Sequence, residues 1–382
     1  MNATEPKKLE KFSFTSSIAA DVSHPKPNPE AYEWWYFDAL SEDGRDAIVI
    51  IFLDNFIFSP RYNKSAQDGS KFKVQSSKSK TGDESAIRNP QSAMENYPAV
   101  AVTYYRDGKP KYRAINEFPV EEFEASAEVP SCRIGENSFR LERAPYGSGY
   151  VVSVNAKLRK NCYLKANFEW LSIESDFQPD KTIFLPDNAH SWNLAVSRAD
   201  VSGRITVTNA KGKATDVVHF RGTGYHDHNF DNRWLPETVS DWQWGRAHFS
   251  DATAVFYRYK EISEKEPSTK IFIVQDGELR EQNASYEEQI FARDIFGIRY
   301  PKRLSFTSED NARLRVKQTK IIDSSFFYLR FLSEMTLTLR DGKPRKTVGI
   351  TEYLAPKALK YRGLDWLVNM RIGRNNKGAF LP

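Results

Sequence analysis

The sequence predicts an all-β protein whose strands form two antiparallel barrels or sandwiches, followed by a short C-terminal helix. Aromatic residues make up 13% of the 382 residues, and this bias is typical of the half-buried surface of a sheet. Short segments of alternating apolar and polar residues recur along the chain. Asp-Gly pairs separate several of these segments, and such pairs favour tight hairpin turns because glycine tolerates positive φ. The pairs are Asp43-Gly44, Asp107-Gly108, Asp276-Gly277 and Asp341-Gly342.

More than ten strands are expected, and so many strands curl or split instead of forming one open sheet. We therefore expect an N-terminal β domain over residues 14–236 and a C-terminal β domain over residues 237–382, with the border in the loop Trp234–Glu237. The one expected helix runs from Pro356 to about Met370. Strands are expected at residues 33–40, 46–58, 100–105, 111–117, 149–158, 166–173, 192–201, 203–208, 217–229, 241–249, 252–259, 270–274, 313–319, 335–339 and 347–354.

Two stretches lack a regular pattern. Lys64–Asn96 is rich in Ser, Lys and Gly, and we expect a long loop that is either a lid or disordered. The first dozen residues are polar and are expected to fray.

Charge and composition exclude several classes of protein. The net charge of +5 is small and dispersed, so no nucleic-acid partner is predicted. With only Cys132 and Cys162, no disulfide framework or cysteine zinc site is expected, which fits a reducing, cytoplasmic setting. The N-terminus lacks a signal-peptide core, and no apolar run approaches the roughly 18 residues of a membrane-spanning helix. The familiar nucleotide-binding, lipase and zinc-protease motifs are missing, so no cofactor is predicted.

The most informative segments are GTGYHDHN, residues 222–229, and SDWQWGRAHF, residues 240–249. Five of the six histidines and four of the eight tryptophans fall between residues 190 and 248. Imidazoles and carboxyls transfer protons, and indoles provide large apolar surfaces. This concentration suggests chemistry on an apolar substrate.

Asp227 is the candidate catalytic acid. In an extended strand, Tyr225, Asp227 and Asn229 share one face, whereas His226 and His228 lie on the other. A carboxyl group in an apolar, aromatic-lined cavity has its charged form disfavoured, so it can stay protonated near neutral pH and act as a general acid. Tyr225, His226 and His228 are candidates to assist it, either in proton donation or as the base that activates water.

The next strand carries candidate substrate-binding residues. Trp242 and Trp244 share one face with Arg246 and His248. Indole faces stabilise a nearby cation by about 0.5–2 kcal/mol each. His248 is a further candidate for the base.

The aromatic strand EWWYFDAL, residues 33–40, adds Glu33 and Trp35 to the candidate substrate-binding residues. Glu33 begins the strand, so it either lines a cavity mouth or is solvated at the strand end. Aromatic residues occupy both faces of this strand, and burial on both sides explains them without any function.

The GTGYHDHN motif also has a purely structural interpretation. Its glycines and asparagine can form a bulge or a barrel corner, with Asp227 bonded to main-chain amides and the histidines filling a barrel end. His226 and His228 could bind zinc together with a third ligand. No acidic cluster accompanies them in the sequence, so no metal site is predicted.

The C-terminal segment 354–378 contains six basic residues and a tryptophan. A basic amphipathic helix can lie on a membrane surface, but the alternative is that it closes a barrel end and turns its charges to water. We favour closure and keep a transient contact with a membrane surface as the second interpretation. The sequence predicts no oligomeric state.

Four motifs together carry a family resemblance. They are EWWYFDALSEDG at residues 33–44, FIFSPRY at 56–62, GTGYHDHN with SDWQW, and GITEYLAPKALKYRGLDWLVNMRIGR at 349–374. They resemble the bacterial hydroxyneurosporene synthase, or carotenoid 1,2-hydratase, family (CrtC-like). The resemblance extends in patches over nearly the whole chain.

This resemblance implies two lipocalin-like β domains packed side by side, with a ligand cavity. It also implies that Asp227 stands at the position of the family's proposed catalytic aspartate. His226 and His228 depart from the residue types of the carotenoid hydratases, which leaves the substrate open. The same superfamily looks to include fungal decalin-forming Diels–Alderases and proteins of the AttH type.

Three functions are compatible with these motifs. The first is a cofactor-independent hydratase or cyclase, in which Asp227 protonates an alkene of an apolar polyene or terpenoid, and water or an internal alkene captures the cation. The second is a pericyclase that folds a polyene and polarises a carbonyl through Arg246 or Tyr225. The third is a non-catalytic carrier of hydrophobic ligands. The sequence favours the first.

Overall fold

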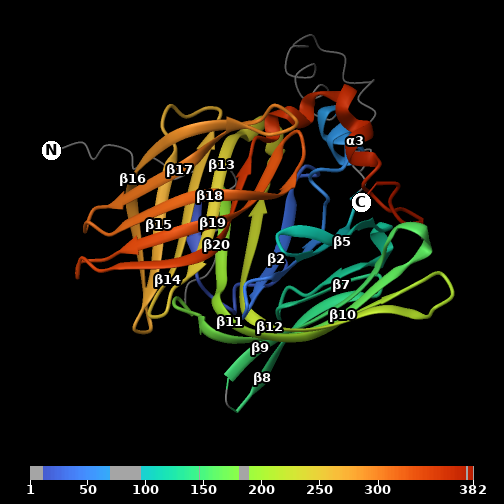
Figure 1. Cartoon of the computed structure of the whole chain (residues 1–382). Helices are drawn as coiled ribbons and strands as arrows, with labels where there is room; N and C mark the ends of the chain where they lie inside the picture. Colours follow the sequence, from blue (N-terminus) through green and yellow to red (C-terminus); the bar gives the residue numbers. More distant parts are fainter. Residues whose placement is uncertain (1–11, 69–95, 146, 180–188, 376, 382) are drawn as a thin grey trace, which may run out of the picture.

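The protein consists of two β-sheets that lie side by side (Figure 1). This computed structural model describes residues 12–68, 96–145, 147–179, 189–375 and 377–381. The first sheet has twelve strands and the second is a closed barrel of eight. Helices within the described residues are few and short. The prediction of an all-β fold with two β units is confirmed.

The twelve-stranded sheet has the order β5-β4-β3-β2-β12-β11-β10-β9-β8-β7-β6, and β1 pairs with β11 in parallel. Near its centre, β2 pairs with β12 from Ser41 opposite Gly222 to Tyr32 opposite Asp231. The strands are β1 (Phe12–Thr15), β2 (Tyr32–Ser41), β3 (Asp46–Leu53), β4 (Ala99–Arg106), β5 (Lys109–Glu117), β6 (Phe123–Ala125), β7 (Ser131–Ile134), β8 (Asn137–Ala144), β9 (Gly147–Lys157), β10 (Tyr163–Ser175), β11 (His190–Thr208) and β12 (Ala214–Asp231).

A one-turn helix, α2 (Leu235–Thr238), connects this sheet to the barrel. The barrel strands pair in sequence order, and the last pairs with the first. They are β13 (Val239–His248), β14 (Thr253–Glu261), β15 (Ser268–Gln275), β16 (Glu278–Arg293), β17 (Arg299–Ser308), β18 (Arg313–Ser324), β19 (Tyr328–Thr338) and β20 (Pro344–Leu354).

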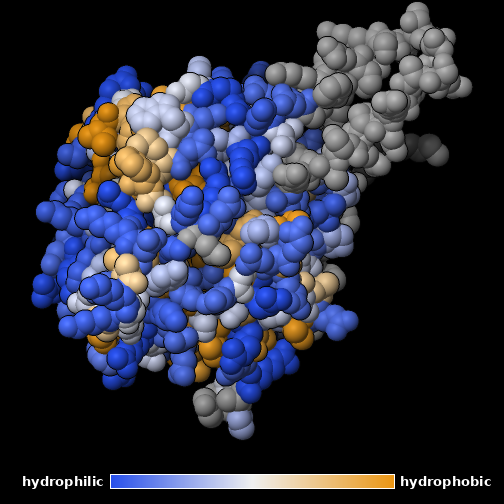
Figure 2. Space-filling model, turned by 90° about the vertical axis from the view of Figure 1, so that its right-hand side faces the viewer, coloured by the Kyte–Doolittle hydropathy of each residue, from blue (hydrophilic) through white to orange (hydrophobic). Residues whose placement is uncertain are grey.

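The remaining regular elements are short helices. Residues 60–68 are helical, and the 3₁₀ helices are Val120–Glu122, Arg159–Asn161, Pro356–Lys360 and Arg362–Leu364. The last helix is α3 (Asp365–Asn369). Among the described residues, no helix combines the length and the apolar character needed to cross a bilayer. The face of the molecule in Figure 2 is mainly hydrophilic, with smaller apolar areas between the polar residues.

In all four Asp-Gly pairs the glycine has positive φ, and in two of the pairs the aspartate has it as well. Asp107 and Gly108, between β4 and β5, have φ of 52° and 66°, and Asp276 and Gly277, between β15 and β16, have φ of 53° and 78°. Positive φ at both central residues is the geometry of a type I′ hairpin turn. These two turns therefore set the register of their hairpins.

Several elements differ from the sequence prediction. β11 is one strand where the sequence predicts two, and the sequence predicts no strand at β1, β6, β7, β8, β16 or β17. Most side chains of β16 are exposed, so this strand gives no apolar alternation. The helix expected from Pro356 to Met370 is broken into two 3₁₀ turns and the five-residue α3. The expected loop Lys64–Asn96 begins in the helical residues 60–68, and its residues 69–95 lie outside the described part, as do residues 1–11.

Strand β2 contributes to two different apolar clusters. Trp34 and Tyr36 belong to a cluster shared with the barrel, which we call the interface cluster. Trp35 and Phe37 point to the other face and belong to a cluster formed within the twelve-stranded sheet, the sheet cluster. Other members of the interface cluster are Phe12, Phe14, Trp192 and Tyr225 from the first sheet and Trp242, Trp244, Tyr257, Tyr259 and Phe272 from the barrel.

The glycines of GTGYHDHN allow the neighbouring strands to come close. A Cβ atom on Gly222 would clash with the main-chain oxygen of Leu40 on β2, and one on Gly224 would clash with Trp170 and Val201. On the other side, β11 shifts its register between Asn193 and Ala199, opposite this part of β12. The motif is therefore a tightly packed, irregular section of the sheet centre.

Gly222→Ala should destabilise the protein by about 1–3 kcal/mol, because the clash is with a main-chain atom that cannot move aside alone. Thermal unfolding followed by circular dichroism would measure the change. Gly363→Ala is the control, since a Cβ there meets nothing within 4 Å. Equal unfolding midpoints for the two variants would contradict this account of the glycine.

Candidate active site

Two adjoining cavities lie between the twelve-stranded sheet and the barrel. The larger has a volume of about 180 Å³ and the smaller a volume of about 30 Å³. Both are lined by Trp34 and Tyr36 from β2, Trp242 from β13 and Glu352 from β20. The smaller cavity is completed by Asp227, Asn229, Trp244 and Tyr257.

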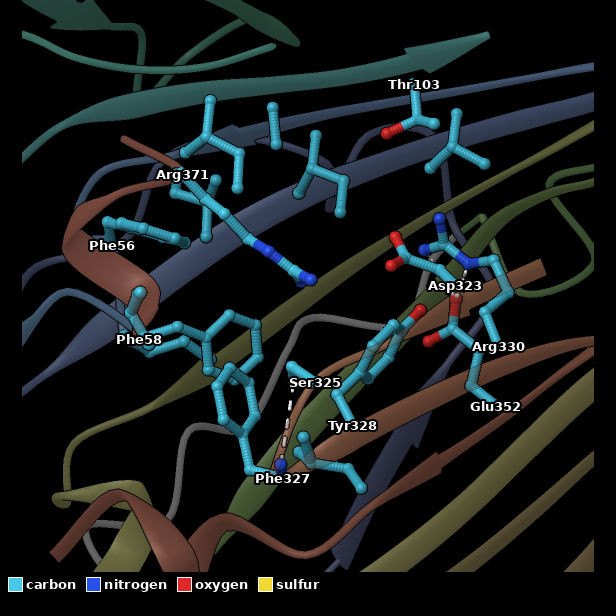
Figure 3. A pocket seen from close by; sticks show the side chains of 18 of the residues that line it. Phe56, Phe58, Thr103, Asp323, Ser325, Phe327, Tyr328, Arg330, Glu352 and Arg371 are labelled. Atoms are coloured by element: carbon cyan, nitrogen blue, oxygen red, sulfur yellow. Dashed lines mark hydrogen bonds and ion pairs between the residues drawn. The ribbon is translucent and has the colours of Figure 1, made fainter. Parts of the chain in front are cut away.

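The larger cavity is apolar on one side and polar on the other. Figure 3 shows Phe56, Phe58 and Phe327 together on one side, and Asp323, Arg330 and Glu352 on the opposite side. Residues of the C-terminal segment also line this cavity, among them Leu367 and Val368 of α3. The segment expected to close a barrel end thus covers the space between the two sheets.

Asp227 is held by three neutral hydrogen-bond donors. Its Oδ2 accepts from Trp192 Nε1 at 2.9 Å and from the Tyr225 hydroxyl at 2.8 Å, and its Oδ1 accepts from Asn229 Nδ2 at 2.9 Å. The side chains of Tyr225, Asp227 and Asn229 therefore share one face of β12, as alternation along the strand requires. Only 4% of Asp227 is exposed.

Burial raises the pKa of Asp227 from 3.8 to about 7, although the hydrogen bonds from Trp192 and Tyr225 act in the opposite direction. Neutral donors stabilise a carboxylate less than a cation would, so the loss of water dominates. A substantial fraction of Asp227 is therefore protonated at neutral pH, and this fraction can give up a proton to a group in the smaller cavity.

Behind Asp227, a hydrogen-bond chain continues through Asn229 to His190. Asn229 donates to Asp227 and must accept with its Oδ1, which lies 3.2 Å from His190 Nε2. Burial lowers the pKa of His190 to about 3, so the ring is neutral and carries its hydrogen on Nε2. The Tyr257 hydroxyl, 2.9 Å from the same nitrogen, accepts this hydrogen too and keeps its own hydrogen for the cavity.

Indoles form much of the remaining wall. Trp34 and Trp242 stack with ring centroids 5.8 Å apart, and Trp244 packs against Tyr225 and Tyr36 at 5.2 and 5.4 Å. The indole nitrogens of Trp242 and Trp244 are buried and have no hydrogen-bond partner among the described residues. The smaller cavity therefore offers aromatic faces beside two carboxyl groups, Asp227 and Glu352, of which Glu352 is paired with Arg330.

Arg246 and His248 lie beyond the two cavities, between the sheets. Arg246 forms an ion pair with Asp38 and donates from Nη1 to His248 Nδ1 at 3.1 Å. His248 donates from Nε2 to the main-chain oxygen of Ser197 at 2.9 Å, and burial keeps its pKa well below the usual value. Neither side chain lines the described cavities, because both are occupied by these partners.

His226 and His228 point to the face of β12 opposite Asp227. His226 stacks on Phe37 at 3.8 Å, and its Nε2 lies 2.8 Å from Asp21 Oδ2. His228 Nε2 lies 2.8 Å from Glu33 Oε1. The two histidines thus bind carboxylates behind the strand, and neither reaches the smaller cavity.

Glu33 and Trp35 share this opposite face. Trp35 is fully buried and stacks on His228 at 4.6 Å. Glu33 is also fully buried, and His24 Nδ1 at 2.7 Å and Lys26 Nζ at 3.1 Å contact its carboxylate. The structure therefore places neither residue at a cavity mouth.

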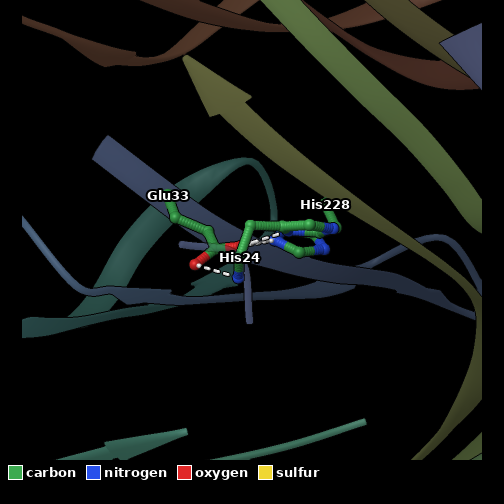
Figure 4. Close-up of side chains that lie close together, drawn as sticks. All are labelled: His24, Glu33 and His228. Carbon is green, nitrogen blue, oxygen red and sulfur yellow. Dashed lines mark hydrogen bonds and ion pairs between the residues drawn. The ribbon is translucent and has the colours of Figure 1, made fainter. Parts of the chain in front are cut away.

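His24, Glu33 and His228 are residues of the types that bind metals, and their ligating atoms lie within 4.8 Å of one another (Figure 4). Lys26 contacts the same Glu33 carboxylate and also Asp54, at 2.7 Å. An ammonium group in this position already neutralises the carboxylate that a metal would need. The cluster is best described as a buried ion network that ties residues 21–26 to β2 and β12.

The chain resembles known proteins both in sequence and in fold. The model of the family "Carotenoid hydratase CrtC" matches residues 179–380, more than half of the chain. The chain belongs to this family. The matched region includes Asp227, the two indoles of β13 and the C-terminal segment, whereas β2 lies outside it.

A curated relative supports the same assignment. The chain is 26% identical over 373 residues to a protein named "hydroxyneurosporene dehydrogenase" from Chlorobaculum tepidum, which covers 96% of this chain and 93% of the relative.

Two solved structures show the same fold. A putative AttH from Nitrosomonas europaea has a TM-score of 0.57 and 14% identity, and covers 92% of this chain and 99% of its own. CghA has a TM-score of 0.53 and 12% identity, with 86% and 88% covered.

Several residues that line the smaller cavity or contact Asp227 were not predicted from the sequence. They include Trp34 and Tyr36, Trp192 on β11, Tyr257 on β14 and Glu352 on β20. Trp34 and Tyr36 belong to a strand with aromatic residues on both faces, so the sequence does not tell which face meets the cavity. The other three come from strands distant in sequence and meet Asp227 only through sheet packing.

The ion network should make stability depend on pH through His228. Contacts with Asp21 and Glu33 raise its pKa from 6.5 to about 9, against the effect of burial. This stabilisation, on the order of 3 kcal/mol for such a shift, is present below pH 6.5 and is lost as the pH rises through 9. His228→Gln should therefore destabilise the protein most near pH 6, and the difference should shrink towards pH 10.

Thermal unfolding midpoints measured from pH 6 to pH 10 would check this expectation. His219→Gln, at an exposed histidine of the same strand, serves as the matched control. A difference between wild type and His228→Gln that is constant over this range would argue against a charged His228.

Proposed function

We propose that the protein is a cofactor-independent hydratase that protonates an alkene of an apolar polyene or terpenoid, with Asp227 as the acid. The observation that carries this proposal is the position of a buried carboxyl, with its pKa raised to about 7, on the wall of an aromatic cavity. Membership of the carotenoid hydratase family supports it.

The proposed reaction takes place in the smaller cavity and the larger one beside it, and it regenerates the acid. Asp227 gives its proton to one alkene carbon, and the positive charge develops on the other, more substituted carbon. The faces of Trp34, Trp242 and Trp244 stabilise this cation. Water attacks the cation, and the proton released from the water returns to the Asp227 carboxylate, which restores the acid.

The hydroxyl of Tyr257 is suited to hold this water. It lines the smaller cavity, and its hydrogen is free because its oxygen accepts from His190. His226, His228 and His248 are engaged elsewhere, so we assign the base to Asp227 itself. Their proposed role is to position the strands around the acid.

Asp227→Asn should lower turnover by at least 100-fold, because general acid catalysis contributes about 10²–10⁴ in rate. The assay is conversion of an acyclic carotenoid or terpenoid, followed by chromatography. Asp231→Asn is the matched control, since Asp231 is buried on the same strand and lines neither cavity. Turnover by Asp227→Asn at the wild-type rate would remove Asp227 from the mechanism.

The thermal stability of Asp227→Asn shows whether a loss of activity in this variant results from unfolding. Burial disfavours the ionised carboxyl, so the stabilisation associated with the protonated form is present at low pH and lost as the pH rises through about 7. Asp227→Asn should therefore unfold at a higher temperature than the wild type at pH 8.

The pH profile of the wild-type reaction should show the protonation of the acid. kcat/KM should be level well below pH 7 and should fall about tenfold per pH unit above it, because only the protonated carboxyl is active. A rate that increases with pH across this range would contradict an acid with this pKa.

Reaction in deuterium oxide separates hydration from the alternatives. Proton transfer from Asp227 places deuterium on carbon, whereas a pericyclic reaction leaves the carbon-bound hydrogens unchanged. A simple carrier returns the polyene without any chemical change. Mass spectrometry of the recovered product distinguishes these outcomes.

A further inference from the structure

We propose that Arg371 binds a single negative charge on the substrate, so that the substrate is a polyene or terpenoid carrying a carboxylate or an acidic enol. The position of the reacting alkene in this inference rests on the proposed function, whereas the anion site does not depend on it.

Arg371 follows α3 and enters the larger cavity from the side of the C-terminal segment. Figure 3 shows its side chain extending from this side towards the middle of the cavity, above the phenylalanines. The side chain is partly buried. It lines the same space as Phe56, Phe58 and Leu367.

The other charged groups of this cavity are already paired. Arg330 binds Glu352, with nitrogen–oxygen distances of 2.7 and 2.8 Å. Arg113 binds Asp323 at 2.8 Å. The cavity lining within the described residues therefore holds three guanidinium groups and two carboxylates, and Arg371 is the cation left over.

The one hydrogen-bond partner of Arg371 among the described residues is uncharged. Its Nη1 donates to the main-chain oxygen of Ser324 at 3.0 Å, and no carboxylate among the described residues lies within 4 Å of it. Burial lowers the pKa of Arg371. The negative charge of Asp323, which is already paired with Arg113, opposes this effect, and the positive charge of Arg113 adds to it. A cation beside an apolar cavity is costly without a counter-charge, and a ligand anion would supply it.

The guanidinium group of Arg371 indicates which class of ligand it would bind. Nε and Nη2 of Arg371 have no partner among the described residues, and a guanidinium presents such N–H groups in a plane that matches a carboxylate. One unpaired positive charge suits a monoanion. A diphosphate would bring more negative charge than the cavity can balance, so a carboxylate or an enolate fits best.

The two cavities then set the direction of the substrate. Arg371 lines the larger cavity and Asp227 lines the smaller one, and the two spaces meet at Trp34, Tyr36, Trp242 and Glu352. An anionic group bound at Arg371 holds the other part of the polyene towards Asp227. Arg371 would thus act as a specificity-determining residue that chooses which alkene is protonated.

The test uses cis-parinaric acid, a fluorescent conjugated tetraenoic acid, and its methyl ester, titrated into the full-length protein at pH 8. Wild type should bind the acid about tenfold more tightly than the ester, which corresponds to about 1.4 kcal/mol. Arg371→Gln should weaken binding of the acid about tenfold and leave binding of the ester within about twofold. Arg371→Lys should keep part of the preference, because it keeps the charge.

Arg362→Gln is the matched control, because this arginine of the same segment pairs with Asp365 and does not line the cavity. It should leave both affinities unchanged. The inference is overturned if wild type does not bind the acid, if it binds acid and ester equally, or if Arg371→Gln weakens both probes alike, which would indicate packing alone.

Titration of Asp227→Asn with the same probes separates this inference from the proposed function. The preference for the acid should persist in that variant, because Asp227 lines the other cavity. If hydration is not observed but the preference persists, the anion site stands without the acid mechanism. If hydration is observed but wild type has no preference, only the assignment of Arg371 is wrong.

Discussion

The site depends on the burial of β12 on both of its faces. This strand pairs with β2 along one edge and with β11 along the other, which covers its backbone. The side chains of residues 225–231 are buried on both faces. Every polar side chain in this stretch must find its partners inside the protein. Because successive side chains point to opposite faces, one short sequence supplies two separate polar environments.

The two environments have opposite effects on carboxyl groups. Behind the strand, Asp21 and Glu33 meet cations, and His226 and His228 contribute to pKa values below the usual range. In front of the strand, Asp227 meets only neutral donors, and its pKa rises. Burial disfavours ionisation in all three cases, so the charge of the partners decides the outcome. The same principle applies to Arg371, which is partly buried and feels the charge of Asp323, a carboxylate already paired with Arg113.

Periodicity in the sequence predicted the general fold and the arrangement along β12, because both follow from local alternation. It grouped Tyr225 and Asn229 with Asp227, and the hydrogen bonds have this pattern. Local alternation could not assign the faces of β2, where both are aromatic. It also could not identify Trp192 or Glu352 as neighbours of the site, since those contacts depend on which strands pair and how the barrel packs. The pairing of Arg246 with Asp38 joins two sheets and has no local signal.

The first described strand has a consequence for any work with shortened forms of the protein. β1 is only four residues long, and its Phe14 packs against Trp192 with ring centroids 5.2 Å apart. Trp192 in turn donates a hydrogen bond to Asp227. A deletion that trims the chain past residue 15 would remove one of the aromatic contacts of this indole and leave those with Tyr257 and Phe272, so one of the three donors to the acid would be held less firmly. Through Trp192, β1 is thus linked to a residue more than two hundred positions later.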